Sequence, residues 1–217
     1  MIRRENFPEL ILGSLLEFSA EHELIGVKAD PLQFHIYPNF FSVNVIDFPM
    51  STMVTVVKRE SAILVGGLSE ERVTGIDQEF IWKLGDRGLF VRITSPHMVA
   101  YRKHENNLSK NLGMCVAGIK LFLQRERHDL YPGGAVWKLS RRRILCAQAR
   151  TISVNSIHCG RISDAIELYL KTFWWNHRFL RFRYLAGLPI MVGYAIVLRI
   201  FSNMTKAITL SLGSRPK

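Results

Sequence analysis

The stretch TGIDQEFIWKLGDRG, residues 74–88, decides how the sequence is interpreted. It predicts a short helix that begins at Asp77 and places Phe80, Ile81 and Leu84 on one apolar face, with a glycine after its last turn. Asp is a common N-cap and stabilises a helix there by about 1 kcal/mol. A carboxylate at a helix start also suits a general base that takes a proton from a hydroxyl. Both roles are open, and the helix dipole is expected to lower the pKa of this carboxyl.

Further elements are predicted on both sides of this helix. Before it lie a helix that opens at Asn6, a β-branched, buried strand at 52–59 and a short helix at 59–67 that ends at a glycine pair. After it, strands are predicted at 89–94 and 98–102, with Pro96 breaking the chain between them. This mixture of helices and strands predicts an α/β class for the first half of the chain.

The second half of the chain differs in pattern and in charge. Amphipathic helices are predicted at 113–128, 137–154 and 162–175, the last with Ser163 as its cap. Residues 1–101 hold 9 Lys/Arg and 13 Asp/Glu, a net charge of −4, whereas residues 102–217 hold 20 and 5, a net charge of +15. These changes predict a boundary near residue 110, with an α/β part at 1–110 and a basic helical part at 111–217.

The order of elements over residues 48–110 resembles the acceptor-side half of the family 2 glycosyltransferases, which have the GT-A fold. The shared features are a serine-threonine strand, a Gly-Gly turn, an acidic helix that ends before a glycine, and a Tyr-Arg-x-His segment followed by a serine. They are carried by Ser51-Thr52, Gly66-Gly67-Leu68, Asp77-Gln78-Glu79, Trp82, Leu84, Gly88, Tyr101-Arg102, His104 and Ser109. The resemblance implies a partial GT-A, Rossmann-like half followed by the basic helical region.

Two departures from the family pattern stand out. The family has a second acid just before the catalytic one, and Ile76 stands at that position. The front half, which carries the nucleotide-binding strands and the D-x-D motif, is missing, and every Asp of this sequence is isolated. The resemblance implies a divalent metal, Mg²⁺ or Mn²⁺, but its D-x-D ligands are absent here. The chain is therefore expected to be either a truncated gene product, inactive alone, or one half of a split enzyme whose partner is a separate N-terminal half.

The resemblance assigns roles to individual residues. Asp77 would be the catalytic base, and Glu79 would orient Asp77 or an acceptor hydroxyl, unless it only compensates the helix dipole. Trp82 would stack on a sugar or, as a bulky apolar residue on this helix, belong to the core. Ser51 and Thr52 would border the acceptor cleft.

Two basic positions lie at, or just after, the end of the strand predicted at 98–102. Arg102 would neutralise the leaving diphosphate, as cations do in phosphate sites. His104 corresponds to a family position that contacts the diphosphate or the metal, and its plainer interpretation is a solvated loop histidine.

The C-terminal part suggests a surface for membranes. Residues 185–198 form an uncharged run of 14, shorter than the roughly 20 residues that span a bilayer, and residues 173–184 mix aromatics with arginines. A monotopic attachment to an anionic membrane is expected, the alternative being a buried helix of a soluble subdomain. The RRR run at 141–143 lacks a stacking or recognition motif, so a nucleic-acid partner is not expected. We expect this run to be a solvated or lipid-facing group of charges.

The expected function is that of an inverting glycosyltransferase that moves a sugar from a nucleotide-sugar donor to a glycan or a lipid-linked acceptor, as in polysaccharide biosynthesis at the cell envelope. The alternative is a non-catalytic glycan- or membrane-binding module derived from such an enzyme. The start of the chain lacks the apolar core of a secretory signal, and the three cysteines form no CxxC pair. A cytoplasmic protein, peripheral on the inner face of the plasma membrane, is therefore expected.

Overall fold

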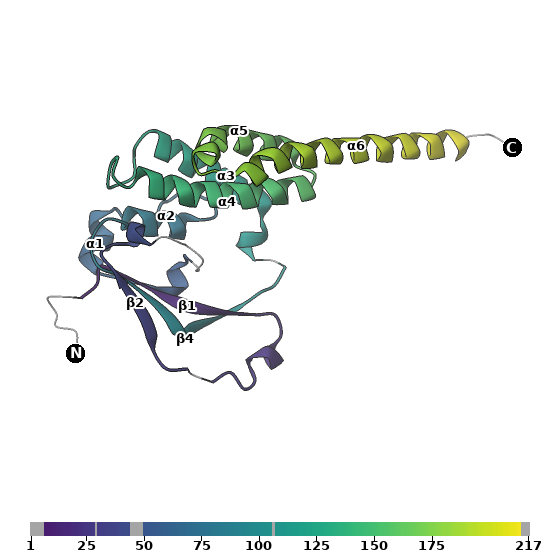
Figure 1. Ribbon diagram of the computed structural model, residues 1–217. Coiled ribbons are helices and arrows are strands. Elements are labelled where there is room, and N and C mark those ends of the chain that lie inside the picture. The colour runs from purple at the N-terminus through teal and green to yellow at the C-terminus, as the bar shows by residue number, and fades with distance from the viewer. Residues whose placement is uncertain (1–6, 29, 44–49, 106, 214–217) are drawn as a thin grey trace. The chain divides into compact units, whose positions relative to one another are not determined.

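The computed structural model describes residues 7–28, 30–43, 50–105 and 107–213 (Figure 1). It divides into two compact units, residues 1–145 and residues 146–217. The first unit contains the sheet and its covering helices, and the second consists of helices. The chain is therefore mixed α/β.

The sheet of the first unit has four strands in the order β2-β4-β1-β3. They are β1 Leu10–Phe18, β2 Gln33–Tyr37, β3 Thr55–Val57 and β4 Phe90–Arg102. The two central strands, β1 and β4, run parallel, and the edge strands pair with them antiparallel. Leu10, Leu12 and Phe90 from the central strands are at most 1% exposed and form part of the core.

The expectation of a first helix is wrong, because Leu10–Phe18 is the strand β1. Asn6, its expected cap, lies outside the described residues. β1 forms ladders on both of its sides, with β3 and with β4. Pairing with two strands that come later in the chain outweighs the weak local preference for a helix.

The break expected at Pro96 is also wrong. β4 continues from Phe90 to Arg102 as one strand of 13 residues. The pairing is irregular around Pro96: the register with β1 shifts on both sides of Ser14, and the register with β2 shifts after Gln33. Proline lacks an N–H for the ladder and is tolerated at such bulges.

The segment after residue 50 forms a 3-10 turn and a short edge strand, rather than the buried strand expected at 52–59. The turn η4 spans Thr52–Val54, and β3 follows it. Val54 is buried, but Val56 is 52% exposed because β3 has a sheet neighbour on one side only.

Two helices of the first unit carry the glycine-rich turns. α1 spans Arg59–Leu64, and Gly66 and Gly67 follow it with positive φ, which confirms the predicted short helix and its stop. α2 spans Ile76–Lys83, so it ends earlier than expected, and Gly88 lies five residues beyond it.

The helices predicted beyond residue 111 are confirmed. They are α3 Leu112–Arg127, α4 Lys138–His158 and α5 Ile162–Arg178, followed by α6 Phe182–Gly213. The cap of α5 is Arg161 rather than the expected Ser163. Short 3-10 turns lie at Glu21–Leu24 (η2), Phe40–Ser42 (η3) and Leu108–Lys110 (η5). The division into compact units falls within α4, and the functional boundary expected near residue 110 stays a prediction.

α3 packs tightly on the segment that leads into α2. Trp82 of α2 meets Phe122 of α3 edge to face, with ring centroids 5.5 Å apart. A Cβ placed on Gly118 would lie 2.2 Å from the carbonyl oxygen of Thr74. α3 therefore approaches the backbone just before Asp77 so closely that only glycine fits at this position.

Candidate functional site

Asp77 lies in the first turn of α2 but does not cap it. The N-cap is Gly75, whose backbone is left-handed with φ of 90°, and Asp77 is the second helical residue. A side chain at Gly75 would be strained by that φ and would press on the ring of Phe122, 2.9 Å away. The capping role that the sequence left open for Asp77 is therefore excluded by its position.

The structure brings Asp77 together with Ser51 and Thr52. The Ser51 side chain and the Thr52 backbone lie close enough to the Asp77 carboxyl to lower its pKa. The backbone N–H of Gln78 also donates to Asp77 Oδ1, at 2.9 Å. Ser51 caps the turn η4 and is half-buried, and Thr52 is exposed. Three residues that the sequence analysis grouped thus meet where η4 faces the start of α2.

Burial raises the pKa of the Asp77 carboxyl above its ordinary value. Hydrogen bonds from Gln78, Ser51 and Thr52 act in the opposite direction and do not overcome it. The expected lowering by the helix dipole is therefore wrong, because desolvation outweighs the contribution of the helix start. A carboxylate whose pKa is raised is a stronger proton acceptor than an ordinary surface aspartate.

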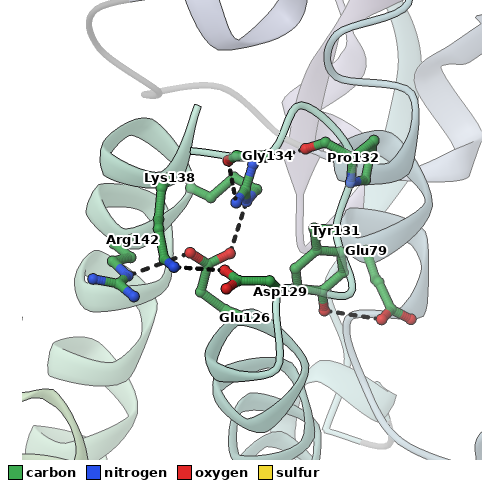
Figure 2. Close-up of polar contacts among 9 residues, drawn as sticks. Glu79, Glu126, Asp129, Tyr131, Pro132, Gly134, Lys138 and Arg142 are labelled. Atoms are coloured by element: carbon green, nitrogen blue, oxygen red, sulfur yellow. Dashed lines mark hydrogen bonds and ion pairs between the residues drawn. The ribbon is translucent and has the colours of Figure 1, made fainter. Parts of the chain in front are cut away.

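Glu79 faces the interior, away from solvent. Its side chain is 0% exposed, and its Oε1 accepts from Arg125 Nη1 at 2.5 Å. Oε1 also accepts from the Tyr131 hydroxyl at 2.9 Å, as Figure 2 shows. Burial and the neighbouring Glu79 carboxylate raise the pKa of Tyr131 far above its ordinary value. The phenol therefore stays protonated and donates a hydrogen bond to Glu79. As placed, Glu79 holds α2 against α3 and the loop after it, and it is not positioned to meet a ligand.

Trp82 also belongs to the core in this structure. It is 2% exposed and meets the rings of Phe122 and Tyr131 edge to face. Such a side chain presents no face on which a sugar can stack. Of the two interpretations that the sequence left open, the core position is the one that the structure contains.

Arg102 and His104 lie at the exposed end of β4. The segment is held by Asn107, which is 8% exposed and was not singled out from the sequence. Asn107 Nδ2 donates to the Tyr101 hydroxyl at 2.6 Å, and Asn107 Oδ1 accepts the backbone N–H of His104 at 3.2 Å. An Asn shortly after a strand is a general turn signal, and only the structure shows that this one fixes the chain around His104.

The described residues do not provide a metal site of the kind that the resemblance implies. Within the described ranges, no three His, Cys, Asp or Glu side chains lie together as ligands for an ion. His104 has no such companions among them. The described residues therefore do not fit the implied divalent ion.

A second polar cluster, which the sequence analysis did not anticipate, joins α3 to α4 (Figure 2). Arg141 is 2% exposed, and its Nε donates to Glu126 Oε2 at 2.7 Å, while its other nitrogens donate to the carbonyls of Pro132 and Gly134. Arg142 lies 3.3 Å from Glu126 Oε1, and Lys138 pairs with Asp129. The expectation that the RRR run forms a solvated or lipid-facing surface is therefore wrong for Arg141. Its buried guanidinium binds the backbone of the loop between α3 and α4.

Comparisons with known proteins identified no relative of this chain. The chain matches no protein-family model, no curated protein and no solved structure.

Proposed function

We propose that this chain is the acceptor-side part of an inverting sugar transferase with a GT-A-like fold, and that Asp77 is its general base. The donor is a nucleotide sugar, and the acceptor is a hydroxyl of a glycan or of a lipid-linked sugar. The observation that carries the proposal is the Asp77 carboxylate, which is half-buried, accepts the backbone N–H of Gln78 and lies close to Ser51 and Thr52.

Several features of the first unit support this role for Asp77. The backbone N–H of Gln78 donates to the carboxylate and orients it, and the raised pKa of Asp77 makes it a better base. Asp77 is the second residue of α2, whose N-cap is Gly75. The buried side chains of Glu79 and Trp82 attach this helix to the core. Rigid support of this kind is what a reacting group needs.

The chemical step balances with Asp77 as the proton acceptor. The acceptor hydroxyl gives its proton to an Asp77 carboxylate oxygen, and the hydroxyl oxygen forms a bond to C1 of the donor sugar. The bond between C1 and the diphosphate oxygen breaks, and the nucleoside diphosphate leaves with that electron pair. Arg102, exposed at the end of β4, is proposed to attract the leaving anion.

The alternative is a binding module without chemistry, and two observations favour it. Ile76 stands where the resemblance implies a second acid, and the Glu79 carboxylate is already bound by Arg125 and Tyr131. In this case Asp77 would accept a hydrogen bond from a glycan hydroxyl and transfer no proton.

The test is release of nucleoside diphosphate by the full chain from a panel of nucleotide sugars with glycan or lipid-linked acceptors. It is run with the chain alone and with any nucleotide-binding half encoded beside it. The substitution Asp77→Asn is expected to lower the rate at least 100-fold, the usual contribution of a general base, and to leave the fold intact.

The exposed Asp30 provides the matched control, because Asp30→Asn makes the same chemical change far from α2 in sequence and is expected to keep the full rate. Equal rates for the wild type and Asp77→Asn would remove Asp77 from the mechanism. Glycan binding by calorimetry without turnover on any donor would favour the binding module.

A further inference from the structure

The second unit carries an exposed apolar stripe along α6. It is formed by Ile190, Tyr194, Val197 and Phe201, whose side chains are 71%, 65%, 46% and 61% exposed. Their spacing of four, three and four residues places them on one face of the helix. Exposed apolar surface that continues over three turns is costly in water and indicates a binding surface.

The opposite face of α6 is the one that packs within the unit. Leu188 is buried in a cluster with Ile157 of α4 and Ala165 of α5, and Met191 and Ala195 pack against the same cluster. The Tyr169 hydroxyl of α5 donates to the carbonyl oxygen of Leu185 at 2.9 Å. The stripe is therefore turned away from the helices that α6 needs for its own packing.

The packed face becomes polar where the cluster ends. Arg199 and Ser202 follow Leu188 and Ala195 at the same helical spacing, and both are exposed. In Figure 1, α6 runs back along α5 and continues well past the N-terminal end of α5. α6 thus has one apolar face along this length and an opposite face that either packs on its own unit or is polar.

This two-faced pattern fits a helix that lies in the plane of a membrane. By length and composition alone, the 21 residues Phe182–Ser202 could cross a bilayer. A crossing helix would place Arg199 and Ser202, and the polar α5 packed along it, in hydrocarbon. An in-plane helix leaves them in water and buries the stripe.

The positive charge of the second unit favours binding to anionic lipid. Residues 146–217 contain ten Lys/Arg and two Asp/Glu, a net charge of +8. Arg178, Arg181 and Arg183 are exposed where α5 turns into α6. Trp174 and Phe182 are exposed beside them, and His177 lies between the two rings, with centroids 6.3 and 6.0 Å away. Aromatic and cationic side chains at one end of an apolar face are typical of the membrane interface.

A second copy of the chain is the other occupant to consider, because the stripe has the spacing of a coiled-coil seam. α6 contains Arg183, Arg199 and Lys206 and no Asp or Glu, so two copies side by side would repel. Ile196, Leu198 and Ile200 are also exposed, which makes the apolar surface wider than a two-helix seam. Both facts favour lipid.

We propose that α6 lies in the plane of an anionic bilayer, with Ile190, Tyr194, Val197 and Phe201 in the acyl region and the other helices of its unit on the water side. This inference does not depend on transfer activity.

The experiment measures binding of the full chain to sealed vesicles of phosphatidylcholine with 30% phosphatidylglycerol by flotation. Phe201→Glu is compared with Ser202→Glu, which places the same charge one residue away on the polar side. Burying one large apolar side chain changes an equilibrium about tenfold or more. We therefore expect at least a tenfold loss for Phe201→Glu and less than a twofold change for Ser202→Glu. Phe201 lies outside the packed cluster, and equal circular dichroism of the two variants checks that both fold.

A second measurement separates the two membrane modes. A tag fused to the C-terminal end should remain open to protease added outside the vesicles, whereas a crossing helix would protect it. Binding with a protected tag, no binding to these vesicles, or equal losses for the two variants would each overturn the proposal. It would equally be overturned if Phe201→Glu dissociates a dimer in sedimentation analysis and leaves vesicle binding unchanged.

Discussion

At the scale of single residues, Asp77 is a carboxylate whose surroundings disfavour its charge. Burial raises its pKa, so the folded chain binds this proton more tightly than the unfolded chain does. The stability that Asp77 contributes is therefore full below the ordinary Asp pKa of about 3.9 and is lost as pH rises through the folded value. At neutral pH the ionised side chain lowers the stability of the protein.

The substitution Asp77→Asn is consequently expected to keep or raise the melting temperature at pH 7. The amide oxygen still accepts the backbone N–H of Gln78, and the desolvated charge is gone. The advantage over the wild type should shrink as pH falls through the raised pKa of Asp77, below which the carboxyl is itself neutral. Thermal melts from pH 4 to pH 8 measure this difference, and Asp30→Asn serves as the exposed control. A clear loss of stability at pH 7 would contradict the assignment of burial as the dominant effect.

The sequence predicts part of the candidate site. Ser51, Thr52 and Asp77 were grouped by the resemblance, and they meet in the structure. The resemblance also placed Glu79 and Trp82 in this site, because they match the acidic helix of the family pattern. The local pattern cannot show that Arg125 and Tyr131, 46 and 52 residues after Glu79, converge on that carboxylate. Long-range partners of a buried charge are invisible to spacing rules, and this is why its role differs from the expected one.

At the scale of elements, an ion pair with a buried carboxylate contributes to the contact between α2 and α3. Arg125 of α3 pairs with Glu79, which is 0% exposed, and with Glu71, which is 51% exposed. We expect Glu79→Gln to lower the free energy of unfolding by about 3 kcal/mol, the lower end of the range for breaking a buried pair, because Arg125 itself reaches solvent. Urea unfolding followed by circular dichroism measures the change.

The same arginine provides the control for that experiment. Glu71→Gln removes the exposed partner of Arg125 and is expected to cost about 0.5 kcal/mol or less, as for surface pairs in general. Similar losses for both variants would mean that the pair with Glu79 contributes no more than a surface contact.

The elements themselves were predicted unevenly, for a physical reason. α3 was found because an apolar stripe with a period of 3.6 residues is a local signal, and α1 because a glycine pair ends it. The strand β1 was taken for a helix, since its local residues tolerate either form and its two partner strands lie 37 or more residues later. β4 passes through Pro96 because its register with both neighbours shifts around that residue.

At the scale of the whole molecule, the two units differ in charge. Residues 1–145 contain 19 Lys/Arg and 16 Asp/Glu, a net charge of +3, whereas residues 146–217 carry +8 on half the length. The first unit holds the candidate transfer site, and the second holds the apolar stripe of α6. We therefore expect substitutions in one unit to leave the other unit unaffected. Asp77→Asn should keep vesicle binding, and Phe201→Glu should keep the fold of the first unit.

The charge of the second unit makes a separate prediction about membrane binding. Each Lys or Arg near an anionic surface contributes about 1 kcal/mol, and this attraction is screened when the Debye length falls from about 10 Å at 0.1 M salt to about 3 Å at 1 M. We expect binding to anionic vesicles to fall at least tenfold over this range and to leave a residual part that salt does not remove. That part comes from the stripe of α6, so it should disappear in Phe201→Glu. Replacing Arg178, Arg181 and Arg183 with Gln should instead flatten the salt dependence and keep the residual part. Binding in the wild type that salt abolishes entirely would show that the stripe does not enter the lipid, because burial of apolar side chains is not screened.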